Sequence, residues 1–206
     1  MTQLSIAAAG PEPTPELAQW FTDPKLAAEL VGLAGRLLDD ATHRAYTLRV
    51  LEPSAGRGNL VRAVRSRAPG ALIDAVELDP RWCHELRVLG GCTVHEGDYL
   101  ARPAPAQRYD LAVCNVPFDG GEEADHLEKL LNEAERVAAL LPARSLHGRD
   151  RHRRVWSRVG QQHEWSLRQF VHMVSRPAFG EKGGSDEIVL VDLRRGVPGP
   201  CDVRWL

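Results

Sequence analysis

Three carboxylates follow short apolar runs, at the points where buried strands are predicted to end. Glu52 comes directly after the first run, Glu77 lies at the end of the second, and Asp98 follows the third. Because the carboxyl ends of parallel strands meet at one edge of an open α/β sheet, we expect these side chains to line one ligand site. A carboxylate there can accept from a ribose diol or an exocyclic amine, although each acid alone also suits a solvated strand end or a turn cap.

A glycine-containing turn links the first predicted strand to a helix that begins near Asn59. It reads Glu52-Pro53-Ser54-Ala55-Gly56-Arg57-Gly58-Asn59. Glycines in such a turn let the backbone bend tightly and approach a ligand closely. The turn has no Lys-Ser/Thr pair for a nucleoside triphosphate, and three acids would repel a pyrophosphate. A ligand with hydroxyls, an amine and a positive centre fits better, and S-adenosylmethionine has all three.

The fourth predicted strand, Tyr109–Cys114, leads directly into Asn115-Val116-Pro117-Phe118. Taken alone, these four residues suit a strand-ending turn, since Asn and Pro are common turn residues. Placed after the glycine turn and the carboxylates, the motif resembles the catalytic motif of the adenine-N6 methyltransferases. The resemblance is especially clear to phage- and plasmid-borne DNA methylases. The segments that resemble this group are Trp20–Pro24, Leu51–Asn59, Val76–Pro80, Gly97–Leu100, Asn115–Leu127, Ser145–Gly148 and Arg176–Phe179.

The resemblance implies S-adenosyl-L-methionine as the methyl donor, S-adenosyl-L-homocysteine as the product, and no metal. It implies that the Asn115 side-chain oxygen and the Val116 carbonyl accept the hydrogens of the target amine. Phe118, after Pro117, is expected to stack on an adenine that has left its base stack. The expected cofactor-binding residues are Thr22, Glu52, Pro53, Ser54, Ala55, Gly56, Gly58, Asn59, Glu77, Leu78, Asp98, Tyr99 and Asn115.

Val116 departs from the usual motif, in which Asn or Asp is followed by two prolines and an aromatic residue. The backbone carbonyl remains, whereas the rigidity of proline is lost. The adenine dimethylases of ribosomal RNA have a similar Asn-aliphatic-Pro-aromatic motif, so ribosomal RNA is an alternative substrate. The chain shows no C-terminal helical domain of the kind those enzymes have, which favours DNA. A protein-glutamine methylase and a non-catalytic module that binds cofactor or nucleic acid are further alternatives.

A basic segment, Arg144–Arg158, follows the fifth predicted strand, although the net charge of the whole chain is −2. One interpretation is a solvated surface helix, and the other is contact with nucleic-acid phosphates. A later glycine-rich loop, Gly180–Ser185, is a second candidate for a position near the substrate. The expected nucleic-acid-binding residues are Arg149, Arg151, Arg153, Arg154 and Lys182.

The elements that must position these residues follow from the hydrophobic pattern. Short apolar runs alternate with helical spacing, which is typical of a parallel sheet covered by helices. The predicted helices are Pro24–Leu38, capped by Asp23 or Thr22, one from Asn59, and Glu122–Val137. The predicted strands are Leu48–Leu51, Ala71–Leu78, Cys92–His95, Tyr109–Cys114, Val137–Leu141, Phe170–Val174 and Ile188–Leu193. With the resemblance, this implies an α/β, Rossmann-like class I methyltransferase fold: a seven-stranded, mostly parallel sheet, helices on both faces and an antiparallel last strand.

The length of 206 residues suits one domain. Residues 1–19 are predicted to form a loose leader and residues 20–206 a single methyltransferase domain without a separate target-recognition domain. No run of about 18 apolar residues occurs, so no transmembrane helix and no membrane contact are expected. The four widely separated cysteines suit reduced thiols in a cytoplasmic protein. The four cysteines form no Cys-x-x-Cys pair, so no metal site is predicted. The expected partners are DNA, with RNA as the alternative, and a second copy in a homodimer.

Overall fold

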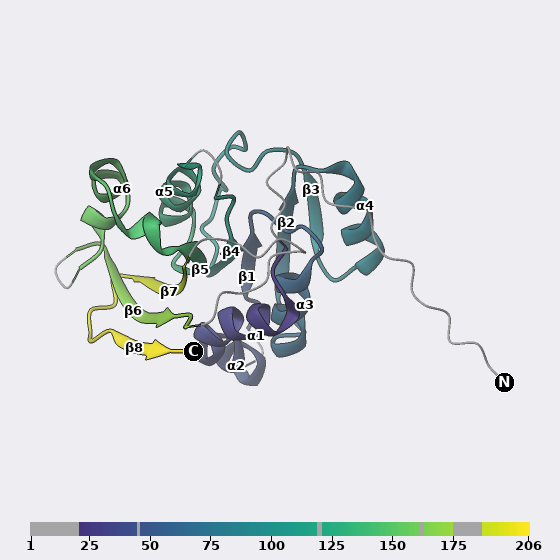
Figure 1. The fold of residues 1–206 in the computed structure, drawn as a ribbon. Coiled ribbons are helices and arrows are strands. Elements are labelled where there is room, and N and C mark those ends of the chain that lie inside the picture. The colour runs from purple at the N-terminus through teal and green to yellow at the C-terminus, as the bar shows by residue number, and fades with distance from the viewer. Residues whose placement is uncertain (1–20, 45, 119–120, 161–162, 175–186) are drawn as a thin grey trace.

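A computed structural model describes residues 21–44, 46–118, 121–160, 163–174 and 187–206 (Figure 1). The predicted leader, residues 1–19, lies outside the described residues, as do Lys182 and the Gly180–Ser185 loop. Within the described ranges, no helix has both the length and the apolar character that crossing a bilayer requires.

Eight strands form one sheet in the order β3-β2-β1-β4-β5-β7-β6-β8. The strands are β1 (Arg49–Glu52), β2 (Leu72–Glu77), β3 (Thr93–Glu96), β4 (Leu111–Asn115), β5 (Arg136–Pro142), β6 (Trp165–His172), β7 (Ile188–Arg195) and β8 (Asp202–Trp205). The helices are α1 (Pro24–Leu33), α2 (Gly35–Arg44), α3 (Asn59–Arg67), α4 (Pro80–Leu89), α5 (Glu123–Glu133) and α6 (Arg149–Arg154), with short 3-10 turns η3 (Ala143–Leu146) and η4 (Trp156–Arg158).

The first five strands of the chain pair in parallel, which confirms the predicted parallel core. Strand β7 runs antiparallel to both β5 and β6, so the last of the predicted strands is antiparallel as expected. The predicted count of seven strands is wrong, because β8 adds an eighth that runs parallel to β6. All four residues of β8 are exposed, so no buried apolar run marked it in the sequence.

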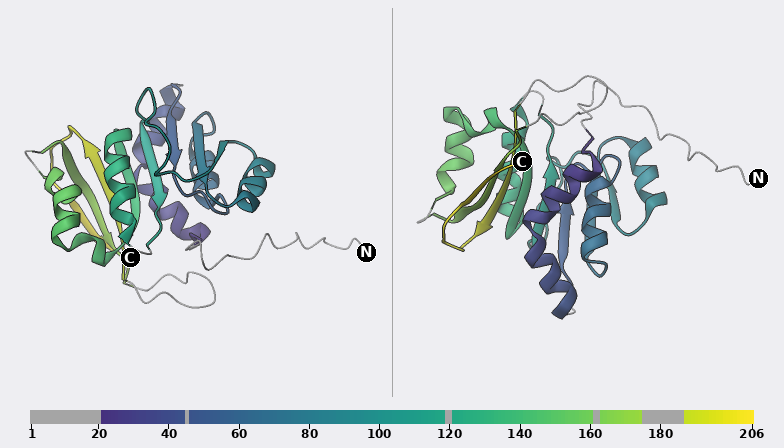
Figure 2. Two further views of the ribbon diagram at one scale, coloured as in Figure 1. Left: turned by 90° about the horizontal axis from the view of Figure 1, so that it is seen from above. Right: turned by 60° about the horizontal axis from the view of Figure 1, so that its bottom comes forward.

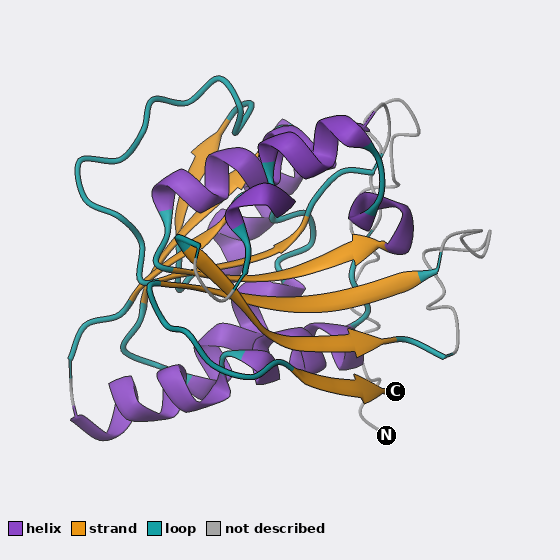
Figure 3. Ribbon diagram, turned by 90° about the vertical axis from the view of Figure 1, so that its left-hand side faces the viewer, coloured by secondary structure: helices purple, strands orange, loops and turns teal. Residues whose placement is uncertain are grey.

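Helices cover both faces of the sheet, as predicted (Figures 2 and 3). On one face, α1, α2 and α3 bury side chains such as Leu30, Leu38 and Val64 against the strands. On the other, α5 buries Leu127 and Leu130 against the alternate strand residues. Side chains alternate between the faces of a strand, so central strands covered on both sides are apolar throughout.

Two predicted helices are shorter than expected. The segment Pro24–Leu38 is divided at Ala34, which ends α1 with φ −89° and ψ 6° and lies beside Gly35, a poor helix former. The segment Glu122–Val137 ends at Glu133, because Ala134 is extended and its successors enter β5. The apolar residues after Ala134 are buried in strand β5. The hydrophobic periodicity of the sequence did not distinguish the end of helix α5 from the beginning of this strand.

A buried ion pair fixes α1 to the sheet. The Arg136 guanidinium lies 2.7 Å from a carboxylate oxygen of Asp192, which joins β5 to β7. Arg136 also donates to the backbone carbonyl of Leu33, at the C-terminal end of α1. A helix terminus leaves carbonyls without intrahelical partners, and Arg136 satisfies one of them. The C-terminal end of α1 is thereby fixed to the sheet, and its N-terminal end points toward the carboxyl edge of the sheet.

Candidate active site

The carboxyl ends of β1, β2 and β4 bring three of the predicted site residues to one edge. Glu52 ends β1 and Glu77 ends β2, which pairs with β1 in parallel. Asn115 ends β4, which pairs with the other side of β1. This is the edge of an open α/β sheet where ligands bind. These three residues are far apart in the sequence, and the parallel pairing of their strands brings them together.

The predicted glycine turn adopts the left-handed backbone that favours glycine. Gly56 has φ 48° and Gly58, which caps α3, has φ 74°. A Cβ on Gly56 would lie 3.0 Å from the Phe21 ring, and one on Gly58 would lie 2.8 Å from Leu86. Both positions therefore favour glycine, because the positive φ strains any other residue and a Cβ would crowd the side chains of Phe21 or Leu86.

Glu77 ties the glycine turn to the second strand. One of its carboxylate oxygens accepts from the Gly56 amide at 2.7 Å, and the other accepts from the Asp79 amide at 2.8 Å. Burial raises the pKa of Glu77, and these backbone donors oppose that shift. An ionised carboxylate has about four acceptor positions, so Glu77 can accept further hydrogen bonds from a ligand.

Glu52 has a buried acceptor without a partner. Its side chain is fully buried, and one oxygen accepts from the Ser54 amide at 3.2 Å. The other, Oε2, has no hydrogen-bond partner among the described residues. Burial, together with the charge of Glu77, raises the pKa of Glu52 well above its ordinary value. A cationic group placed there would stabilise the carboxylate, so the site fits the positive centres of S-adenosylmethionine.

Thr22 connects the glycine turn with the Asn115 motif. Its hydroxyl accepts from the Asn115 side-chain amide at 3.0 Å, and its backbone carbonyl accepts from the Asn59 side-chain amide at 2.8 Å. Thr22 is held directly before α1, where Asp23 caps the helix by accepting from the Lys25 amide, as predicted. The resemblance had suggested Thr22 as a cofactor contact, and the structure shows its contact with Asn115.

The remaining residues of the predicted catalytic motif are mostly buried. Val116 is 2% exposed and Phe118 is 6% exposed, and Phe118 belongs to the apolar cluster on the α1 face. Pro117 is half-buried between them. The backbone carbonyl of Phe118 accepts from the Arg144 guanidinium at 2.9 Å. Arg144, two residues after β5, thus fixes the end of the motif.

The other predicted cofactor residues differ in exposure. Asp98 is exposed and one of its oxygens accepts from the Leu100 amide, so it also stabilises a turn. Leu78 is exposed beside Glu77, where an apolar ligand surface could cover it. Tyr99 is buried, and its hydroxyl donates to Glu133 at 3.0 Å. The Tyr99 ring therefore contributes to the packing of α5, and its role toward a cofactor stays a prediction.

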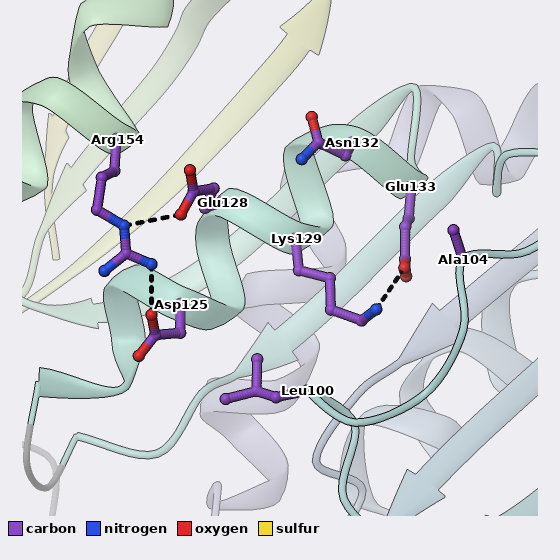
Figure 4. Close-up of a pocket in the computed structure, with 8 residues that line it drawn as sticks. All are labelled: Leu100, Ala104, Asp125, Glu128, Lys129, Asn132, Glu133 and Arg154. Carbon is purple, nitrogen blue, oxygen red and sulfur yellow. Dashed lines mark hydrogen bonds and ion pairs between the residues drawn. The ribbon is translucent and has the colours of Figure 1, made fainter.

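The basic segment packs against the acidic helix α5. The Arg151 guanidinium lies 2.6 Å from a carboxylate oxygen of the fully buried Glu123. Arg154 bridges Asp125 and Glu128, beside a surface hollow of about 470 Å³ (Figure 4). Both arginines have carboxylate partners on another element.

Arg149 and Arg153, by contrast, are exposed on α6. Arg153 pairs with Asp150 of the same helix, which is also exposed, and such surface pairs contribute little to stability. Among the four described arginines predicted to bind nucleic acid, these two are the more accessible to a phosphate. That function stays a prediction for all of them.

Phe21, Glu123 and Arg144 are residues of this region that were not among the predicted site residues. Phe21 packs edge-on against Trp82, with ring centroids 4.9 Å apart, and Arg57 lies over the Phe21 ring. Phe21 therefore covers the glycine turn from outside. In the sequence, the position of Phe21 next to Thr22 was the one indication that it belongs to the site. The contacts of Glu123 and Arg144 join residues that are far apart in sequence, so they could not be predicted.

Comparisons with known proteins agree with this architecture. No protein-family model matches the chain, and no curated protein matches it in sequence. Among solved structures, a candidate RNA methyltransferase from Pyrococcus horikoshii is 19% identical, with a TM-score of 0.70 and coverage of 94% of each chain. The 23S rRNA methyltransferase ErmE is 19% identical, with a TM-score of 0.60 over 87% of this chain and 71% of its own.

A third similar structure is a TehB-like, S-adenosylmethionine-dependent methyltransferase from Corynebacterium glutamicum. It is 12% identical, with a TM-score of 0.54 over 82% of this chain and 86% of its own. At these identities the similarity is one of fold. The chain therefore has the Rossmann-like fold of the class I, S-adenosylmethionine-dependent methyltransferases.

Proposed function

We propose that this protein is an S-adenosylmethionine-dependent methyltransferase that methylates the N6 amine of adenine in DNA. The main support is the joint placement of Glu52, Glu77 and Asn115 at one sheet edge, with Thr22 between the glycine turn and Asn115. A candidate cofactor site and a candidate amine-binding motif are thereby adjacent. This arrangement favours the catalytic interpretation of the Asn115 motif over that of a plain strand-ending turn.

In this proposal the cofactor is held by the turn and the three acids. Glu52 offers its unpartnered oxygen to the cofactor's positively charged groups. Glu77 accepts from ribose hydroxyls, and Asp98 accepts from the adenine amine of the cofactor. The bound cofactor supplies an electrophilic methyl group on a sulfonium.

The Asn115 motif holds the acceptor. The Asn115 side-chain oxygen and the Val116 carbonyl accept the two hydrogens of the N6 amine, so the nitrogen lone pair faces the methyl donor. The bond between N6 and the methyl carbon would form as the bond from that carbon to the cofactor's sulfur breaks, which leaves S-adenosyl-L-homocysteine, and the methylated amine would then release one proton to solvent. Most of the rate enhancement then comes from positioning and fixed dipoles. Because the Phe118 ring is nearly covered, we expect it to move when a base enters.

Ribosomal RNA is the second candidate substrate. Two observations favour it: the aliphatic Val116 in the motif, and the fold similarity to ErmE, which is a 23S rRNA methyltransferase. The resemblance of the sequence motifs to those of phage- and plasmid-borne DNA methylases favours DNA. The two polymers share the adenine N6 amine, so one assay distinguishes them.

The test is methyl transfer from labelled cofactor to unmodified DNA and to unmodified ribosomal RNA, each digested to nucleosides. We expect label in N6-methyldeoxyadenosine. Label in RNA alone would replace DNA with the second candidate. Tight cofactor binding by calorimetry without label in any nucleic acid would instead support a non-catalytic binding module and contradict the proposal.

A further inference from the structure

Within the part of the chain that the structure describes, the outer edge of β8 is open. Strand β8 pairs with β6 on one side and ends the sheet, and no described strand pairs with its other side (Figure 3). All four of its residues are exposed. An unpaired edge presents a row of backbone donors and acceptors to any strand that can approach it, and proteins usually protect such edges.

Exposed apolar side chains gather at this edge. Val203 is 55% exposed, Trp205 is 68% exposed and Val174 is 71% exposed. Leu206 is also exposed, and its carbonyl accepts from the Val174 amide, so the end of β6 lies beside the end of β8. The Trp205 ring is held against His172, with centroids 4.8 Å apart. A group of exposed apolar side chains of this kind indicates an interaction surface.

The backbone direction of β8 follows from its bonds to β6. The Leu206 amide donates to His172, and the Leu206 carbonyl accepts from Val174, so both polar groups of Leu206 face β6. Along a strand the backbone groups alternate in direction. Those of Arg204 therefore also face β6, and those of Val203 and Trp205 face the open edge.

The charges on β8 are complementary to a second copy of the same strand. Asp202 and Arg204 lie on either side of Val203. Two copies of β8 that run antiparallel about a two-fold axis at Val203 place Asp202 of each copy opposite Arg204 of the other. Opposite charges at facing positions stabilise a strand pair, whereas an axis at Arg204 would place like charges together. The sequence of the strand thus selects one register.

We infer that the outer edge of β8 binds a second copy of this chain by antiparallel strand addition centred on Val203. The result is a two-fold symmetric dimer with one continuous sheet, and the same patch is used on both copies. The outward backbone groups of Val203 pair across the axis. This dimer does not depend on methyl transfer, so its test is separate from that of the proposed function.

The first test is sedimentation equilibrium of the full chain and three variants. We expect the wild-type protein to be a dimer. Either Arg204→Asp or Asp202→Arg should raise the dissociation constant of the dimer by about tenfold or more, since each creates like-charge pairs across the axis. The double variant Asp202→Arg/Arg204→Asp restores complementary charges and brings the constant back toward the wild-type value. A monomeric wild-type protein, or a double variant as weak as the single ones, would overturn the inference.

The second test is a disulfide across the axis, which reports the register directly. Facing residues in a hydrogen-bonded antiparallel pair have Cα atoms about 5.5 Å apart, which suits a disulfide. In a Cys201→Ser background, Val203→Cys should form a covalent dimer on mild oxidation. The control is Val88→Cys on α4, which is 72% exposed and far along the sheet order from β8. Equal cross-linking of both variants, or none at position 203, contradicts the proposed interface.

Discussion

The Asn115 side-chain amide donates a hydrogen bond to the Thr22 hydroxyl over 3.0 Å, although 93 residues separate the two in sequence. Asn115 ends the central strand β4, and Thr22 directly precedes α1. Both side chains are buried. The amide of the candidate catalytic residue is thus oriented by a segment that also contacts the glycine turn through Asn59.

Thr22→Val keeps the shape of the side chain and removes the hydroxyl that accepts from Asn115. One buried donor is then without its partner, which costs about 1–2 kcal/mol. We expect kcat to fall about tenfold at saturating cofactor. Thr22→Ser keeps the hydroxyl and is the matched control. Equal activity of the valine and serine variants would show that this hydrogen bond does not orient Asn115.

Asn115→Ala removes the side-chain oxygen proposed to accept from the target amine. We expect methyl transfer to be abolished, with cofactor affinity by calorimetry nearly unchanged. Asn132→Ala is the control, because Asn132 is exposed on α5. Unchanged turnover of the Asn115 variant would contradict the proposed role.

The variant Glu52→Gln tests the effect of the Glu52 charge on protein stability and, separately, on cofactor binding. Burial raises the pKa of Glu52 in the folded protein, so the carboxyl favours folding in its neutral form. This contribution is complete below the ordinary value of 4.5 and is lost as pH rises through the raised folded pKa. Without cofactor, the amide variant should therefore lose less stability than the wild type between pH 5 and about pH 8.

The same variant should bind the cofactor more weakly, because it lacks the negative charge. The wild-type affinity should also rise with pH as Glu52 ionises. Urea unfolding and calorimetry at both ends of the pH range measure the two effects. If the free energies of unfolding of the variant and the wild type changed with pH in the same way, Glu52 would not be the titrating group.

Arg151→Met removes the partner of the fully buried Glu123, whereas Arg153→Met removes an exposed pair. The side chain of Arg151 is 28% exposed and that of Arg153 is 78% exposed. We expect the first variant to lose about 2–3 kcal/mol of unfolding free energy and the second less than about 0.5 kcal/mol. Adding Glu123→Gln to the first should restore part of the loss, and thermal or urea melts measure all three.

Arg149→Ala combined with Arg153→Ala tests the proposed phosphate contacts. Each lost contact should reduce the slope of log affinity against log salt by about one, with folding unchanged. Arg44→Ala, at the exposed end of α2, is the control. An unchanged slope would remove α6 from the nucleic-acid interface.

The parallel core and the order of the three acids followed from local patterns. Apolar runs that end in Glu52 and Glu77 are strand signals, and parallel strands place their carboxyl ends together. The division of the first helix at Ala34 and the eighth strand were not predictable in this way. The apolar spacing continues across Ala34 and Gly35 and so concealed the division of the helix, and β8 depends on pairing with β6 rather than on burial.

The sequence by itself determined the alternation of strands and helices, the glycine turn and the residue types at the sheet edge, because each depends on neighbours along the chain. Only the tertiary structure decided which residues meet across the chain. It placed Thr22 against Asn115, gave Arg151 a buried carboxylate partner and, among the described strands, left one side of β8 without a partner strand. Such contacts form between residues far apart in sequence, where side-chain geometry and burial, rather than periodicity, select the partner.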